Sequence, residues 1–169
     1  MGLDMYLARR TYVKNWDHQS PEERHSITVK RGGVTREDIK PERISYVIEQ
    51  VAYWRKANAI HKWFVDNVQD GKDECQESYI TQEQLAELVA LCKLVLSSVE
   101  TVDGNLHTGT THYPDGRVVH QTQPGQVVAQ KGIAASALPP QGGFFFGSTE
   151  YDEYYLDDLR ETIKQLEPM

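Results

Sequence analysis

The spacing of the apolar residues changes near residue 50, and this change requires both strands and helices in the fold. In residues 3–13 and again in residues 43–50, apolar residues recur at every second position, which predicts two strands. A short strand is predicted at residues 27–29, and one helical turn is predicted at residues 20–23.

Further along the chain the apolar residues recur at helical intervals. The pattern predicts a first helix over residues 51–69 and a last helix from about residue 149 to residue 166. Between them, Thr81 and Gln84 form a capping-box pattern that opens a helix over residues 82–98. The chain is therefore expected to form three main helices.

Residues 101–141 contain many Gly, Thr, Gln and Pro residues and few large apolar ones. A turn sequence at residues 113–116 lies between two segments suited to strands, so we expect an exposed β-hairpin arm. So few apolar residues cannot pack on their own, and the segment is long for an irregular loop. We therefore predict that a second chain orders the arm, which makes the protein a homo-oligomer.

Together these patterns predict the α+β class, with a small mixed sheet, three main helices and a projecting β-hairpin arm. A chain of 169 residues is the size of one ordinary domain. We therefore expect a single domain over residues 1–169, with residues 101–141 as an exposed arm or insertion.

The sequence favours a cytoplasmic protein. No run approaches 18 consecutive apolar residues, so we expect no membrane-spanning helix and no membrane partner. The first residues show neither the basic nor the apolar region of a secretory signal. The two cysteines, Cys75 and Cys92, cannot form a disulfide framework, which agrees with a reducing compartment.

The net charge of −7 is concentrated in the second half of the chain. Residues 73–169 contain five basic and fifteen acidic side chains, which gives −10. Elsewhere basic and acidic side chains are interleaved, so a general nucleic-acid partner is disfavoured. We interpret the acidic half first as a solvated surface and second as a mimic of nucleic acid. A local basic pocket in the first half can still hold a small phosphorylated ligand.

The sequence lacks the HExxH, paired-cysteine, nucleophile-elbow, Walker and dinucleotide-binding patterns. We therefore predict no metal, no cofactor and no catalytic residue, which leaves enzyme activity unsupported rather than excluded. A zinc site of His107, His112 and His120 is disfavoured, because pairing around the turn places His112 opposite Arg117. His120 then points to the other face of the hairpin unless a bulge intervenes.

Residues 53–64 form the most unusual segment, because two Trp, one Tyr, one Phe, one His and three cations fall within twelve residues. On a helix, Arg55, Asn58 and Lys62 share one face. Trp54 and His61 lie on the neighbouring face. A cationic strip beside an aromatic strip suits a stacked base whose phosphate is held by arginine. The alternative is a core helix whose Trp rings pack inward while Arg and Lys extend outward.

The candidate ligand-binding residues are Trp54, Arg55, Lys56, Asn58, His61, Lys62, Arg9, Arg10, Tyr151 and Tyr154. The two arginines of the first strand join the site if that strand lies beside the helix, and the two tyrosines reach sugar or base groups. Residues 142–149 are predicted as a buried strand that leads through a glycine into the last helix. Glu150 and Asp152 would repel an anion there, so we interpret this junction as structural.

Three segments are distinctive as whole strings: MGLDMYL at residues 1–7, YWRKANAIHKWF at residues 53–64 and GFFFGSTEYDEYY at residues 143–155. Together they resemble an uncharacterised family of small bacteriophage and prophage proteins. The resemblance implies the cytoplasm of an infected bacterium as the setting. It implies no activity and transfers no catalytic or binding residue.

Three function hypotheses follow. The first is a phage-encoded, non-catalytic binding protein that sequesters a nucleotide-derived immune signal and so counters bacterial antiviral defence. The alternative is a protein-binding inhibitor or adaptor that acts on a host enzyme through its acidic half. The third is a small metabolic enzyme. The expected partner is accordingly a small phosphorylated, nucleotide-like ligand or a host protein.

Overall fold

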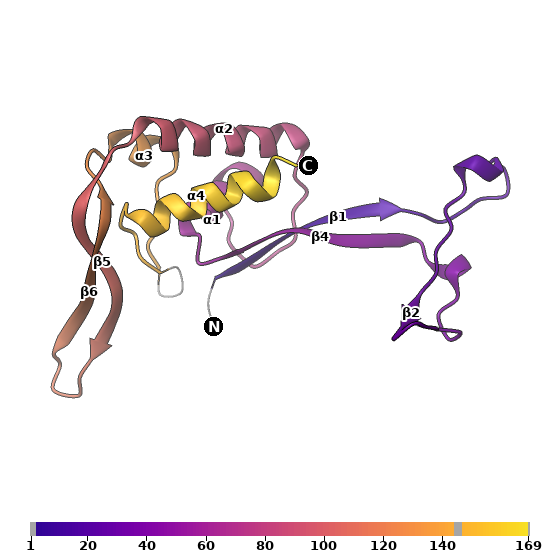
Figure 1. Ribbon diagram of the computed structural model, residues 1–169, viewed down its shortest axis with the longest axis horizontal. Coiled ribbons are helices and arrows are strands. Elements are labelled where there is room, and N and C mark those ends of the chain that lie inside the picture. The colour runs from indigo at the N-terminus through magenta and orange to yellow at the C-terminus, as the bar shows by residue number, and fades with distance from the viewer. Residues whose placement is uncertain (1–2, 144–146, 169) are drawn as a thin grey trace. The chain divides into compact units, whose positions relative to one another are not determined.

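The computed structural model describes residues 3–143 and 147–168, and it has an α+β fold with three substantial helices. The strands form three separate two-stranded sheets, β1–β4, β2–β3 and β5–β6, instead of one mixed sheet. In chain order (Figure 1), the elements are β1 (Asp4–Tyr12), β2 (Lys30–Arg31), β3 (Val34–Thr35), β4 (Tyr46–Arg55), α1 (Asn58–Val68), α2 (Gln82–Ser98), β5 (Thr101–His112), β6 (Val118–Val128), α3 (Gly132–Ala137) and α4 (Glu153–Leu166).

The chain divides into two compact units. Unit 1 comprises Met1–Met5 and Tyr53–Met169, and unit 2 comprises Tyr6–Ala52. Unit 2 contains nine basic and seven acidic side chains, a net charge of +2, which leaves −9 for unit 1 out of the total of −7. The two units therefore differ in the sign of their charge.

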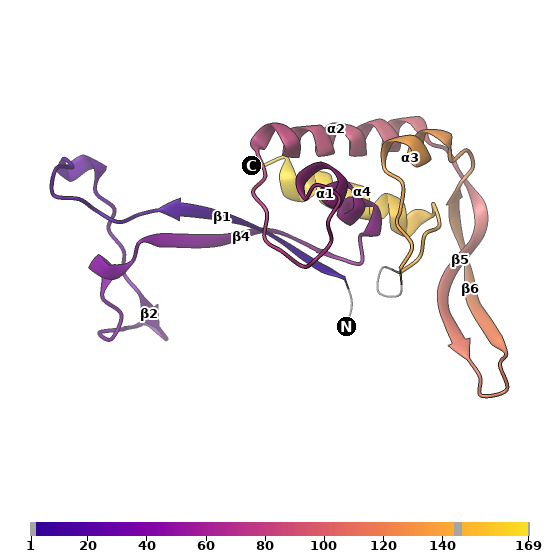
Figure 2. The same ribbon diagram turned by 180° about the vertical axis from the view of Figure 1, so that it is seen from behind.

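Unit 1 contains the larger apolar core. Helices α1 and α2 both contact α4, as the view from behind shows (Figure 2). The apolar side chains of α2 and α4 that are at most 2% exposed are Leu88, Cys92, Val95, Leu156 and Leu159. Helix α2 has the predicted bounds, and Thr81 and Gln84 form the predicted capping box. Burying one such leucine contributes roughly 1.5–3 kcal/mol, so this helix pair stabilises the unit.

The predicted first helix is wrong at its start, because β4 continues to Arg55. Burial alternates at the end of this strand: Ala52 and Trp54 are buried, whereas Tyr53 and Arg55 are exposed. Lys56 then adopts the left-handed backbone region, with φ of 60°, and ends the strand. Helix α1 begins only at Asn58, so the aromatic segment is part strand and part helix.

The last helix begins at Glu153 instead of about residue 149. Asp152 caps it, because its Oδ1 accepts a hydrogen bond from the Tyr155 backbone N–H at 3.1 Å. Of the strand predicted at residues 142–149, residues 142–143 and 147–149 are not extended strand, and residues 144–146 lie outside the described residues.

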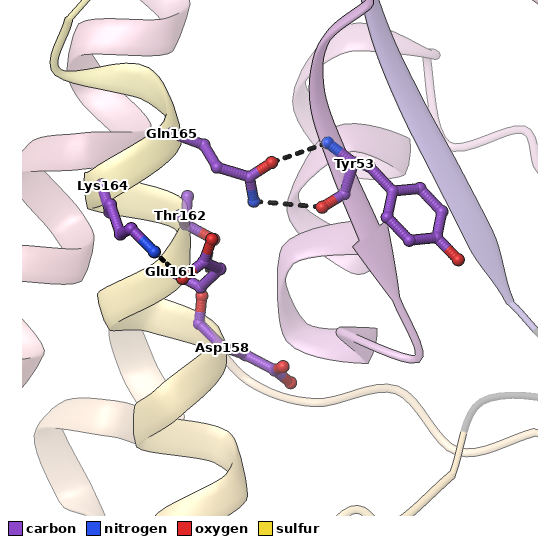
Figure 3. A network of polar contacts seen from close by, with 6 residues as sticks. All are labelled: Tyr53, Asp158, Glu161, Thr162, Lys164 and Gln165. Carbon is purple, nitrogen blue, oxygen red and sulfur yellow. Dashed lines mark hydrogen bonds and ion pairs between the residues drawn. The ribbon is translucent and has the colours of Figure 1, made fainter.

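A pair of polar contacts joins the end of β4 to α4 (Figure 3). The Gln165 side-chain oxygen accepts from the Tyr53 backbone N–H at 2.7 Å, and its amide nitrogen donates to the Tyr53 carbonyl at 3.0 Å. The buried Trp54 indole N–H donates to Thr162 Oγ1 at 2.9 Å. Gln165 of α4 thus satisfies the backbone N–H and carbonyl of Tyr53, the two groups that a neighbouring strand would otherwise bond.

The predicted hairpin is present, as β5 and β6, but it is shorter than the expected arm of residues 101–141, because residues 132–137 form α3, in which Ala134 is buried. Its base is anchored within the chain: Leu106 and Val128 are buried, and the Gln126 backbone N–H donates to Glu153 at 3.1 Å. The Tyr154 hydroxyl also accepts from the Gln123 side chain at 2.8 Å. The base of the arm therefore needs no second chain to order it, and the homo-oligomer stays a prediction for the residues beyond the base.

Unit 2 is held mainly by polar contacts. Its buried apolar residues among those described are Val13 and Ala52. The predicted strand at residues 27–29 is wrong in position, because these residues are not in a strand. The strand β2 follows at Lys30–Arg31 and pairs with β3 as an antiparallel hairpin around Gly32 and Gly33. The predicted helical turn is a 3-10 turn at Pro21–Glu23.

No helix in residues 3–143 and 147–168 is both long and apolar enough to cross a bilayer.

Candidate functional site

The structure disperses the cation and aromatic strips that the sequence places on one helix. Arg55 ends β4, so it does not share a helical face with Asn58 and Lys62. The side chain of Trp54 is only 4% exposed, and its ring packs at 5.6 Å from Phe64. Trp54 is therefore a core residue whose ring cannot stack on a base in this structure.

Lys56, just before α1, and Asn58, the first residue of α1, form hydrogen bonds with other segments of the chain. The Lys56 backbone N–H donates to the Leu3 carbonyl at 2.7 Å. The buried Asn58 side chain donates to the Ser148 carbonyl at 2.5 Å. These bonds join α1 to segments that are far away in the sequence. The Arg55 and Lys56 side chains remain exposed.

His61 and Lys62 each lie beside a carboxylate. The buried His61 has Nε2 3.5 Å from Asp73 Oδ1, and the Lys62 ammonium lies 2.7 Å from Asp66 Oδ2. The charge of Lys62 is therefore already compensated. His61 faces the interior of unit 1, where it cannot stack on a ligand from solvent.

Arg9 and Arg10 lie in unit 2 and have partners there. Arg9 forms an ion pair with Glu49, with 2.8 Å between Arg9 Nη2 and Glu49 Oε2. The Arg10 guanidinium lies 4.3 Å from the centre of the Tyr46 ring. Arg9 is therefore neutralised, whereas Arg10 belongs to an exposed cation–aromatic pair.

Tyr151 and Tyr154 lie at the start of α4, as the sequence predicts, but they contact the chain itself. The Lys131 ammonium lies 5.7 Å from the Tyr151 ring centre, and the Tyr151 carbonyl accepts from the Val128 backbone N–H. Tyr154 accepts from Gln123, as described above. Both tyrosines therefore fasten the base of the arm to α4.

Two carboxyl groups of this region have shifted pKa values. Burial raises the pKa of Asp158 to about 7, and the neighbouring charges of Asp157 and Asp152 add to the effect. Burial also raises the pKa of Asp152, against the lowering effect of backbone N–H donors. The Asp158 carboxylate extends from α4 on the side of Tyr53 (Figure 3), and it has no hydrogen-bond or ion-pair partner among the described residues.

The two cysteines differ in burial, and the described residues form no cluster of three metal-ligating side chains. Burial raises the pKa of the Cys92 thiol to about 12, so this thiol is inert at neutral pH. Cys75 is exposed. Among residues 3–143 and 147–168, no three side chains of His, Cys, Asp or Glu gather in a group that could hold a metal ion.

Unit 2 presents an exposed surface that the sequence analysis missed. Arg10 and Tyr12 of β1 and Tyr46 and Ile48 of β4 occupy alternate positions of two paired strands, and we call this set the ribbon face. Tyr12 and Tyr46 pack edge to face with ring centres 5.2 Å apart. All four side chains are exposed, and Ile48 is 64% exposed. Strand alternation places them on one side of the β1–β4 ribbon.

A second cation–aromatic pair follows in the same unit. Trp16 is 48% exposed, and the Lys14 ammonium lies 5.2 Å from its ring centre. The signal that could have found these residues is the alternation of aromatic and basic residues along the predicted strands. The strands were predicted from the alternation of apolar and polar residues alone, and the binding residues were predicted mainly in the more conspicuous segment at residues 53–64.

Each unit also has an open hollow. The hollow of unit 2 has a volume of about 320 Å³ and is lined partly by Asn15 and His25. The Asn15 side chain donates to the His25 carbonyl and accepts from the His25 backbone N–H, both at 2.8 Å. In unit 1 a groove of about 430 Å³ lies between α2 and the C-terminal residues, lined partly by Leu85, Val89 and Leu166.

Comparison with protein-family models, with curated proteins and with solved structures gave no match for this chain. The resemblance to phage proteins therefore stays a prediction, and the function must be argued from the geometry of the chain alone.

Asp158 should make the stability of the protein depend on pH. In the unfolded chain an aspartate loses its proton near pH 4, whereas in the folded chain this group loses it near pH 7. Between these values the folded state holds more protons, so this group lowers the free energy of unfolding as the pH rises. The Asp158→Asn variant should lack this contribution and be more stable than the parent at pH 8 by about 1–3 kcal/mol.

Urea unfolding of both proteins at pH 5 and pH 8 measures this difference. Glu161→Gln is the matched control, since the Glu161 carboxylate is exposed on the same helix and paired with Lys164 at 3.3 Å. Equal pH dependence in the parent and in Asp158→Asn would show that the carboxyl is hydrated and titrates normally.

Proposed function

We propose that this protein is a non-catalytic binding protein that acts by contact with another protein, and that the ribbon face of unit 2 makes the contact. In the setting that the phage resemblance implies, it would be an inhibitor or adaptor of a host enzyme. The observation that carries the proposal is the exposure of Tyr12, Tyr46 and Ile48 in a unit that buries few apolar side chains of its own.

The composition of the ribbon face supports a protein partner. Tyr, Trp and Arg are enriched where proteins bind one another, and contiguous exposed apolar residues mark such sites. The rings of Tyr12 and Tyr46 and the Arg10 guanidinium already contact one another, so little side-chain freedom remains to be lost on binding. Ile48 adds an aliphatic side chain at a position that has no polar role.

The same observations disfavour nucleic acid as the partner. The net charge of unit 2 is only +2, and Arg9 and Arg36 are paired with carboxylates. Nucleic-acid binding depends on cations that are free to neutralise phosphates. An exposed isoleucine offers no stacking plane for a base, whereas it suits an apolar pocket on a protein.

The acidic half of the chain is the alternative contact that the sequence suggested. Unit 1 has a net charge of −9, but several of its acidic side chains are paired within the chain, among them Asp157 with Arg160 and Glu167 with Lys93. The pairs leave the net charge of −9 unchanged, but these carboxylates already contact cations of their own unit and are less available to cations of a partner. This face is therefore the weaker proposal.

Ile48→Asp should weaken binding of the protein partner by about tenfold to a hundredfold, because a buried isoleucine contributes roughly 1.5–3 kcal/mol. The partner is found by placing a photo-crosslinking amino acid at position 46 in a chain expressed in bacteria. Leu94→Asp is the matched control, since Leu94 is an exposed leucine of α2 in unit 1.

The proposal predicts one discrete crosslinked protein, whose yield falls in Ile48→Asp and is kept in Leu94→Asp. Circular dichroism of both variants checks that they fold. Crosslinks to nucleic acid alone, or equal yields from both variants, contradict the ribbon face as the contact.

Sequestration of a nucleotide-derived signal is the second candidate function. The observation that favours it is the pair of consecutive exposed cations, Arg55 and Lys56, which have no ion-pair partner among the described residues. Their charges are available to a phosphate. The aromatic partner that the sequence suggested for them, Trp54, is buried and does not contribute.

A thermal-shift screen against mono-, di- and cyclic nucleotides tests this candidate, since a bound ligand raises the melting temperature by mass action. For a nucleotide that binds, Arg55→Ala should lower the affinity about tenfold to a hundredfold, the loss of one charge-assisted contact of roughly 1.5–3 kcal/mol. Arg117→Ala, in the arm, is the control that should keep the parent affinity. Calorimetry measures both. An unchanged affinity in folded Arg55→Ala rules out this contact.

A further inference from the structure

The hairpin arm contains a bulge that changes which histidines meet. Strands β5 and β6 pair Thr110 with His120 and His107 with Thr122, and the register shifts between His107 and Gly109. The sequence analysis placed His120 on the other face unless a bulge intervened. That expectation rested on His112 opposite Arg117, which is wrong: the structure pairs His112 with Val118, so His120 lies opposite Thr110 on the same face. The bulge between His107 and Gly109 then brings His107 to that face as well.

The two imidazoles converge on one atom. His107 Nε2 lies 2.9 Å from Thr110 Oγ1, and His120 Nδ1 lies 3.1 Å from the same oxygen. The ring centres are 5.6 Å apart, with an angle of 58° between the ring planes. The Thr110 hydroxyl has one hydrogen and can donate to only one of the two nitrogens, so the other nitrogen must donate to it.

This cluster lies at the surface of the arm, where its hydrogen bonds link β5 to β6. His120 and Thr110 are exposed and His107 is half-buried, so the cluster contributes little burial. The contacts that anchor the arm to α4 come from Gln123 and Gln126, nearer its base. Solvent ions can therefore reach the two ring nitrogens without any part of the core opening.

We propose that His107 and His120 form a two-histidine chelate for a late first-row divalent metal ion such as Cu²⁺, Ni²⁺ or Zn²⁺. The ion takes the position between the two ring nitrogens that Thr110 Oγ1 now occupies. Imidazole nitrogen suits these ions, whereas Mg²⁺ and Ca²⁺ prefer oxygen ligands. This site is separate from the ribbon face and does not depend on the proposed function.

The geometry requires only a small closure of the arm. A zinc–imidazole bond is about 2.0–2.1 Å long, so each nitrogen must approach the present oxygen position by about 1 Å. Rotation of the Thr110 side chain away from the two rings allows this approach. Two protein ligands leave coordination positions for water, and the ion links β5 to β6 across the arm.

Titration calorimetry with Cu²⁺ and Ni²⁺ tests the site on a chain free of any affinity tag. The Cys75→Ser background removes the exposed thiol, which could bind these ions itself. The expected result is one ion per chain at this site. His107→Ala and His120→Ala should each weaken binding at least tenfold, because each removes one of the two ligands.

His112→Ala is the matched control, since His112 lies on the same arm outside the cluster. It should keep the parent affinity, and Mg²⁺ should produce no binding heat. Electron paramagnetic resonance of the Cu²⁺-loaded chain should show nitrogen coupling that is reduced in His107→Ala. Parent-like affinity in His107→Ala and His120→Ala, or an equal loss in His112→Ala, overturns the proposal.

Discussion

The attachment of the β4 end to α4 is the interaction on which the rest of unit 1 depends. The Gln165 side chain forms hydrogen bonds with the backbone N–H and carbonyl of Tyr53, and Thr162 Oγ1 accepts a hydrogen bond from the indole N–H of the buried Trp54. An unpaired indole N–H in this position would cost about 1–3 kcal/mol. Because α4 holds the strand end, the chain can turn at Lys56 and begin α1 against the same helix.

The sequence predicts the parts of the fold in which one pattern acts alone. Helix α2 has both an apolar stripe and a capping box, and its bounds match the prediction. The start of α1 could not be found in this way, because the aromatic residues at 53–54 fit both a strand and a helix. Contacts that are distant in sequence decide between them: β4 pairs with β1, and Gln165, 112 residues away, bonds the backbone of Tyr53. The bulge in the arm likewise depends on the register of the hairpin.

The ambiguity between strand and helix at residues 53–54 also explains why the predicted ligand site does not form. A helix over residues 51–69 would have exposed Arg55 and Lys62 together, whereas the observed strand and helix separate them and bury Trp54. Composition identified an unusual segment correctly, but an aromatic-rich segment forms a core as readily as a binding surface. Unit 2 exposes Tyr12 and Tyr46 in contact with each other, where the sequence pattern indicated only ordinary strands.

Trp fluorescence tests most directly the central claim, that the two tryptophans of residues 53–64 are core residues and do not form a binding surface. The chain has three tryptophans, and Trp54 and Trp63 are buried whereas Trp16 is exposed. In Trp16→Phe the remaining emission should be blue-shifted and poorly quenched by acrylamide, compared with the parent. A red-shifted, readily quenched emission in this variant would place Trp54 or Trp63 at the surface and contradict the account.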